Sequence, residues 1–148
     1  MNIPFSPPDI TEEEIEAVAE VMRSGWITTG PKTKELERKM AEFTHTNRGV
    51  CLNSATSCME MALRLFEIGP GDEVIVPAYT YTASASVVCH VGATLRLVDV
   101  EKGTFHIDYA AVESMINENT KAIIPVDLGG VMVDYDRIRA IVESKKSL

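Results

Sequence analysis

The segment VCLNSATSCMEMALRLF, residues 50–66, decides the fold, because the spacing of its apolar residues changes partway along it. The first three residues are typical of a short buried strand, whereas the later apolar residues recur at helical spacing. The change falls on Asn53, Ser54, Ala55 and Thr56. A helix that begins there presents unpaired backbone N–H groups and the positive end of its dipole, which together suit a phosphate. The segment therefore predicts a phosphate-binding turn, and simple capping of the helix by Ser or Thr is the alternative.

Predicted helices and strands alternate on both sides of this segment. Strands separated by helices of about ten residues form parallel β-α-β units, so we expect an α/β sheet with helices on both faces. Ligands of such sheets bind at the carboxyl ends of the strands, which the polar residues of 53–56 and 78–84 follow. We expect strands at residues 50–52, 73–76, 94–98 and 122–126, and helices at about residues 11–23, 33–43, 82–91, 108–117 and 135–144.

Other polar and aromatic residues are weaker functional candidates. Tyr79 and Tyr81 follow the strand at 73–76, where two phenols either suit a planar polar ligand or complete the core. Asp127 follows the strand at 122–126 and is either a ligand contact or a turn carboxylate. The histidines lie near no cluster with the spacing of zinc ligands, and the sequence contains neither a GxGxxG nor a P-loop motif.

Composition and charge exclude several classes of protein. With 148 residues and 45% hydrophobic residues, the chain is long enough for one domain with a real core. Its formal net charge of -8 argues against a nucleic-acid partner, which would require Lys and Arg massed on one face. Because we find neither a signal-peptide pattern nor a membrane-spanning run, we expect a cytoplasmic protein without a membrane partner. Cys51, Cys58 and Cys89 form no CxxC pair, and we expect three buried thiols.

Five motifs, in order, resemble those of the DegT/DnrJ/StrS family of sugar aminotransferases, which use pyridoxal phosphate (PLP) on a type I aminotransferase fold. Together they extend over nearly the whole chain, and their order is far more specific than any single motif. They are SGWITTGP at 24–31, NSATSCMEMA at 53–62, GPGDEVIVPAYTY at 69–81, TKAIIPV at 120–126 and GGVMVDYDRI at 129–138.

The resemblance implies a cofactor site at the turn described first. Ser54, Ala55 and Thr56 would hold the cofactor phosphate at the helix N-terminus, and Tyr81 would stack on the pyridine ring. Ala55 stands where the family more often has Gly, so a left-handed backbone there would be strained. Asp127 stands where many members have His.

The resemblance also implies that this chain is the N-terminal portion of a longer enzyme. Residues 1–31 correspond to an N-terminal helix and a substrate-side loop containing Trp26 and Thr28, which in the family often lies near the partner subunit of a dimer. Residues 32–148 correspond to the first part of the PLP-binding large domain. The family's cofactor-bound lysine, and the acid that pairs with the pyridine nitrogen, lie beyond the equivalent of Leu148. We therefore expect an incomplete type I large domain without catalytic residues, inactive alone and without bound PLP.

For the parent protein, we expect transfer of an amino group from an amino acid such as glutamate to a nucleotide-linked keto-sugar, in amino-sugar biosynthesis. Two alternatives stay open: a sugar dehydratase of the same family, in which histidine replaces the lysine, and a non-catalytic sensor or interaction protein with this fold. In the family, strands encoded later separate the strand at 50–52 from the other three. The sheet of this chain then has free edges, and we expect a homodimer or another form of self-association.

Overall fold

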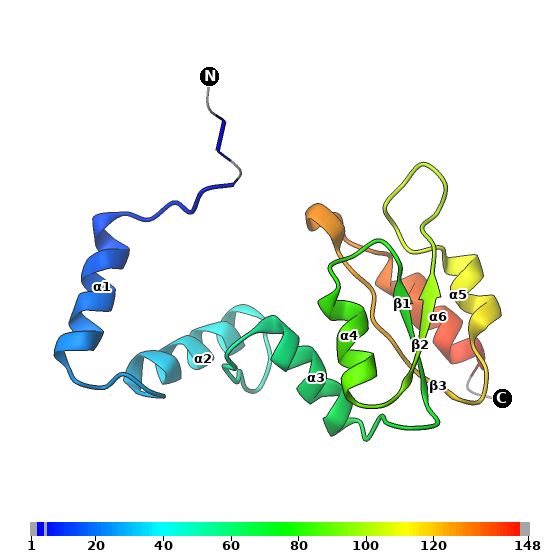
Figure 1. Ribbon diagram of the computed structural model, residues 1–148, viewed down its shortest axis with the longest axis horizontal. Coiled ribbons are helices and arrows are strands. Elements are labelled where there is room, and N and C mark those ends of the chain that lie inside the picture. Colours follow the sequence, from blue (N-terminus) through cyan, green and yellow to red (C-terminus); the bar gives the residue numbers. More distant parts are fainter. Residues whose placement is uncertain (1–2, 5, 146–148) are drawn as a thin grey trace. The chain divides into compact units, whose positions relative to one another are not determined.

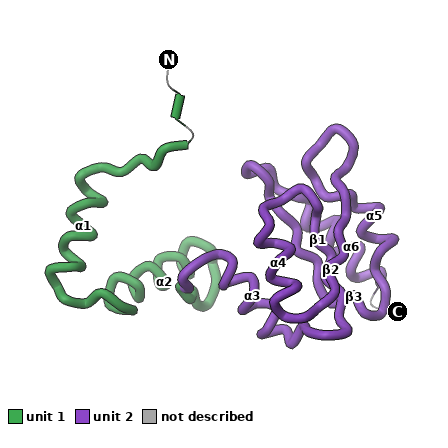
Figure 2. The backbone as a smooth tube through the Cα atoms, viewed as in Figure 1, with its two compact units in different colours: residues 1–51 green, residues 52–148 purple. Residues whose placement is uncertain are grey.

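The chain divides into two compact units, Met1–Cys51 and Leu52–Leu148 (Figure 2). The computed structural model describes residues 3–4 and 6–145 of the chain. Within these residues, no helix is both long enough and apolar enough to cross a membrane.

Two helices form the first unit, α1 (Glu12–Arg23) and α2 (Pro31–Phe43) (Figure 1). A capping box opens α1, since the Glu14 carboxylate accepts the backbone N–H of Thr11 at 2.6 Å while Thr11 Oγ1 accepts an N–H of the first turn at 3.3 Å. Proline opens α2, where its missing N–H breaks no helical hydrogen bond. Both helices are amphipathic, yet their apolar side chains are exposed or only half-buried. The exposed ones include Ile15, Val18 and Met22 of α1 and Leu36, Met40 and Phe43 of α2.

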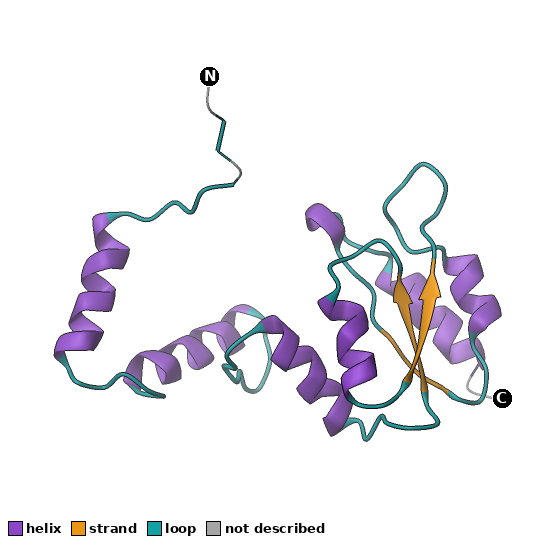
Figure 3. Ribbon diagram, viewed as in Figure 1, coloured by secondary structure: helices purple, strands orange, loops and turns teal. Residues whose placement is uncertain are grey.

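The second unit is built on a three-stranded parallel sheet with the strand order β2-β1-β3 (Figure 3). The strands are β1 (Glu73–Pro77), β2 (Thr94–Val98) and β3 (Thr120–Ile123). β1 pairs with β2 in continuous register, and its pairing with β3 shifts once, between Glu73 and Val74. Because β1 has a neighbour on each side, its residues 74–76 are completely buried. The predicted parallel α/β sheet is confirmed.

Helices cover both faces of this sheet (Figure 1). Successive side chains of a strand point to opposite faces, so β1 contributes to two core clusters. Val74 and Val76 pack with buried residues of α3 (Ala55–Leu65) and α4 (Ala83–His90). Ile75 packs with buried residues of α5 (Tyr109–Met115) and α6 (Tyr135–Lys145). A short 3-10 helix, η1 (Leu128–Gly130), lies between β3 and α6.

The structure corrects several predictions about local structure, and the strand expected at residues 122–126 is β3, which covers Thr120–Ile123. Residues 50–52 form no strand, and Val50 is 75% exposed, because a strand needs a neighbour and no described strand pairs with this segment. The three thiols are not buried: Cys58 and Cys89 are exposed and Cys51 is half-buried. Cys58 and Cys89 lie on α3 and α4, at positions that the apolar contact of these helices with the sheet leaves in solvent.

Candidate functional site

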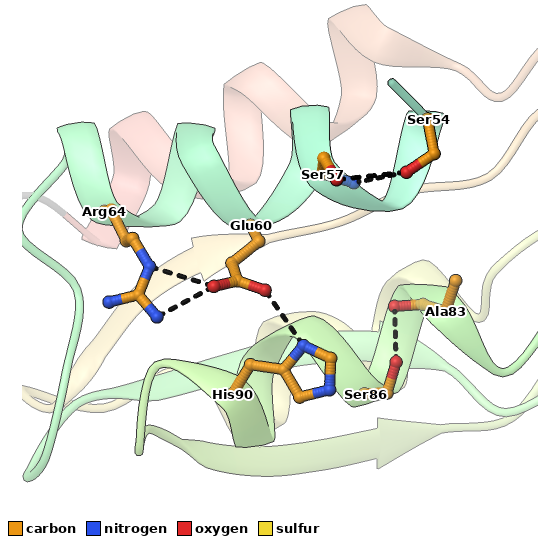
Figure 4. Close-up of polar contacts among 7 residues, drawn as sticks. All are labelled: Ser54, Ser57, Glu60, Arg64, Ala83, Ser86 and His90. Atoms are coloured by element: carbon orange, nitrogen blue, oxygen red, sulfur yellow. Dashed lines mark hydrogen bonds and ion pairs between the residues drawn. The ribbon is translucent and has the colours of Figure 1, made fainter. Parts of the chain in front are cut away.

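The N-terminus of α3 is the centre of the candidate site (Figure 4). Ser54 is its N-cap residue, and Ser54 Oγ accepts the backbone N–H of Ser57 at 3.1 Å and lies 3.1 Å from Ser57 Oγ. The backbone N–H groups of Ala55 and Thr56 have no acceptor among the described residues, as expected for the first turn of a helix. Ala55 does not have a left-handed backbone, so the strain considered above does not arise. Two free N–H groups at the positive end of the helix dipole suit a phosphate.

Tyr81 lies in the loop between β1 and α4, with 80% of its surface exposed. The carbonyl of Tyr81 accepts the backbone N–H of Ser84 at 3.1 Å, which ties this loop to the first turn of α4. The ring of Tyr79 is already used, since it stacks on Phe105 with 5.4 Å between centroids and 16° between planes. Of the two phenols, Tyr81 is therefore the one whose ring faces stack on no other ring of the described chain.

The packing of α3 on α4 brings residues 54–56, predicted to hold a phosphate, and Tyr81, predicted to stack on the ring, to the same end of the helix pair. Figure 4 shows Ser54 and Ala83, which lie where these helices begin, at one end of the pair, and His90 at the other. Tyr81 lies in the loop that follows β1, one residue before the N-cap of α4, at the carboxyl edge of the sheet. Because residues 50–52 form no strand, the position of Ser54 depends on the contact of α3 with α4.

Asp127 stabilises the loop between β3 and α6. Its Oδ1 accepts the backbone N–H of Val133 at 2.9 Å, and its Oδ2 accepts the hydroxyl of Tyr135 at 2.9 Å. Burial raises the pKa of Tyr135, and the hydrogen bond to the Asp127 carboxylate raises that pKa further. Both oxygens of Asp127 are thus used within the loop, which agrees with a turn carboxylate rather than a ligand contact.

In the first unit, Trp26 and Thr28 lie in the loop between α1 and α2. The indole Nε1 of Trp26 donates to the carbonyl of Thr29 at 2.9 Å. The ring lies against Gly30, where an added Cβ would stand 2.2 Å from the indole Cδ1. Trp26, Thr28 and Gly30 help to line a cavity of about 300 Å³, and Trp26 remains 57% exposed.

A polar bridge between α3 and α4 is the feature that no sequence motif indicated (Figure 4). Glu60 Oε2 lies 3.0 Å from Nδ1 of His90, while Glu60 Oε1 accepts Nε and Nη2 of Arg64 at 3.0 and 2.8 Å. The hydrogen bonds from Arg64, and then the one from His90, lower the pKa of Glu60. Glu60 and Arg64 are four residues apart, a spacing that indicates a side-chain pair on one face of a helix. His90 is 30 residues away from Glu60, so sequence spacing does not indicate its contact.

The fold and the site define a class of protein, namely one with part of the α/β fold of PLP-dependent aminotransferases. A parallel sheet has helices on both faces, and a capped helix N-terminus and an exposed tyrosine lie at the end where the helices begin. No group of three or more His, Cys, Asp and Glu in the described part of the chain is arranged to hold a metal ion. The chain belongs to the DegT/DnrJ/EryC1/StrS aminotransferase family, whose model matches residues 8–147.

Solved structures agree with this assignment. A protein of Streptococcus pneumoniae assigned as a sugar aminotransferase, in its PLP form, is 60% identical over 99% of this chain and 38% of its own, with a TM-score of 0.97. An aminotransferase from Psychrobacter cryohalolentis is 34% identical over 95% of this chain and 36% of its own, with a TM-score of 0.89. The E. coli GDP-4-keto-6-deoxy-D-mannose-3-dehydratase, 24% identical over 97% of this chain and 39% of its own, shares the fold with a TM-score of 0.88. This chain spans between 36% and 39% of the length of these proteins.

Proposed function

We propose that this chain is the N-terminal portion of a PLP-dependent aminotransferase that transfers an amino group from an amino acid to a nucleotide-linked keto-sugar. One observation carries the proposal. This chain, which belongs to the family and is 60% identical to a protein assigned as a sugar aminotransferase, keeps the N–H groups of Ala55 and Thr56 free at the start of α3. The dehydratase likeness, at 24% identity, extends to the fold alone, so aminotransfer is the function we favour.

The residues present fit two parts of PLP, its phosphate and one face of its ring. Ser54 would orient the first turn of α3, and the N–H groups of Ala55 and Thr56 would donate to the phosphate. The exposed ring of Tyr81 would cover one face of the pyridine. Bound PLP would supply an electron sink for moving the amino group.

In this proposal, each part of the parent protein supplies a different part of the active site. Residues 1–31 would supply the substrate-side loop with Trp26 and Thr28, and residues 32–148 the first part of the PLP-binding large domain. The lysine and the acid that complete the site would come from the remaining length of the parent, so this chain alone would be inactive. We place the parent in the cytoplasm as a homodimer, and the exposed apolar side chains of α1 and α2 support self-association.

The test compares the full-length parent with the 148-residue chain. Each is titrated with PLP by absorbance and then incubated with glutamate and a nucleotide-linked keto-sugar, and the 2-oxoglutarate released is measured. We expect the parent to bind PLP, to release no more than one 2-oxoglutarate per bound PLP without the sugar, and to release it over many turnovers when the sugar is present. The short chain should bind no PLP and release none. Formation of a deoxy sugar without an amine would favour the dehydratase, and a parent that does not bind PLP would refute both enzymes.

A further inference from the structure

We propose that Glu60 and His90 are positioning residues, which hold α3 on α4 so that the N–H groups at its start face the cofactor phosphate. The inference rests on the proposed function, since it assumes that a phosphate binds there. It concerns the middle of α3, where Glu60 lies six residues beyond Ser54, or about 9 Å along a helix axis.

The first step is that α3 depends on α4 for its placement. Leu63 is buried in the same cluster as Val87, Val88 and Val91, and Met59 packs against that cluster. These apolar contacts are non-directional, so they resist separation of the helices more than rotation of α3 about its axis. Residues 50–52, which lead into α3, pair with no described strand and so add no restraint from the sheet.

The second step is that the polar bridge supplies direction. The carboxylate of Glu60 can only accept, so Nδ1 of His90 must carry the proton and donate across the 3.0 Å between them. Arg64, one turn further along α3, engages the other oxygen and fixes the rotamer of Glu60. The side chain of His90 is 49% exposed and that of Glu60 29%, so the bridge is partly shielded from solvent.

The third step connects the bridge to the site. Ser57 and Glu60 are three residues apart on α3 and so lie on one side of it, and Figure 4 shows both on the helix that Ser54 caps. A rotation that released Glu60 from His90 would also carry the N–H groups of Ala55 and Thr56 around the helix axis, away from their present positions. The bridge therefore sets the positions of the donors, although it touches neither phosphate nor ring.

The experiment measures binding in the full-length protein with two probes, PLP and pyridoxal, which lacks the phosphate. The variants are Glu60→Ala and His90→Ala, with His90→Asn retaining a donor near the place of Nδ1. The control is His106→Ala, the same change in the loop between β2 and α5. Thermal unfolding of each variant shows that it is folded, and Glu60→Gln provides a milder variant if Glu60→Ala is not.

Loss of this partly exposed hydrogen bond is expected to weaken PLP binding by about two- to fivefold. Pyridoxal binding should stay unchanged, the double variant should bind PLP no more weakly than either single variant, and His90→Asn should restore affinity. Equal losses for PLP and pyridoxal, or wild-type PLP affinity in both alanine variants, would overturn the positioning role alone. A wild-type protein that binds no PLP would overturn the proposed function and this inference together.

Discussion

Replacing Ser54 by Asp separates two roles of this position, the capping of α3 and the binding of a phosphate at the start of the helix. Asp caps helices about as well as Ser, so the variant should keep the bond to the N–H of Ser57 that Ser54 Oγ makes at 3.1 Å. Ser54→Ala should instead cost about 1 kcal/mol at this helix end, which corresponds to about fivefold faster hydrogen exchange of the Ser57 amide. Stability and helix protection should therefore fall in the alanine variant and not in the aspartate variant.

For binding of the PLP phosphate the order of the two variants should be reversed, with Ser54→Asp weakened more than Ser54→Ala. Two like unit charges about 4 Å apart repel by about 1 kcal/mol in water and about 4 kcal/mol at an effective dielectric constant near 20. Since a phosphate carries close to two charges, Ser54→Asp should weaken PLP binding in the full-length protein by at least about tenfold.

The assays are absorbance titration with PLP and amide exchange across α3. Ser114→Asp, on α5, adds the same charge where Ser114 Oγ only donates to the carbonyl of Ala111, and it should bind PLP normally. Wild-type PLP affinity in Ser54→Asp would show that the phosphate does not lie at the start of α3.

Three further results are expected. Ile75, completely buried in the central strand, should lose about 2–5 kcal/mol of unfolding free energy on change to Ala and about 0.5–1.5 kcal/mol on change to Val, by urea titration. The pKa of Glu60 is lowered from 4.5, so its stabilising effect is complete above that value and is lost as the pH falls through the lowered pKa; Glu60→Gln should flatten the acid side of a plot of stability against pH. The pKa of Tyr135 is raised above 10.0, so its contribution is complete below that pH and is lost as the pH rises through the raised pKa. Asp127→Asn should move the pKa of Tyr135 back toward 10.0, as followed by ultraviolet absorbance.

Features set by neighbouring residues could be predicted from the sequence. The capping box at Thr11 and Glu14 is complete within one turn, and Ser54 caps a helix that begins where the apolar spacing changes. The helix at 108–117 was predicted slightly too long, since α5 ends at Met115. Burial of β1 also followed from its continuous apolar residues, because a central strand of a parallel sheet is covered on both faces.

Features set by residues far apart in the chain could not be predicted in this way. Whether residues 50–52 form a strand depends on a partner strand, which local spacing does not supply. The bridge from Glu60 to His90 joins two helices through side chains that individually resemble ordinary solvated groups. Phe66 fits the helical spacing of the apolar face of α3, yet it is 77% exposed, because no described residue packs over it as part of a core cluster.

The indole of Trp26 makes position 30 dependent on position 26. Any residue larger than Gly at position 30 would meet the ring, with a Cβ only 2.2 Å from Cδ1, and would displace it from its bond to the carbonyl of Thr29. The two positions therefore cannot change independently: a side chain at 30 requires the loss of the large ring at 26. In return, the bond from Trp26 to Thr29 holds the loop in shape before any molecule arrives, so the loop would lose less conformational entropy on binding one.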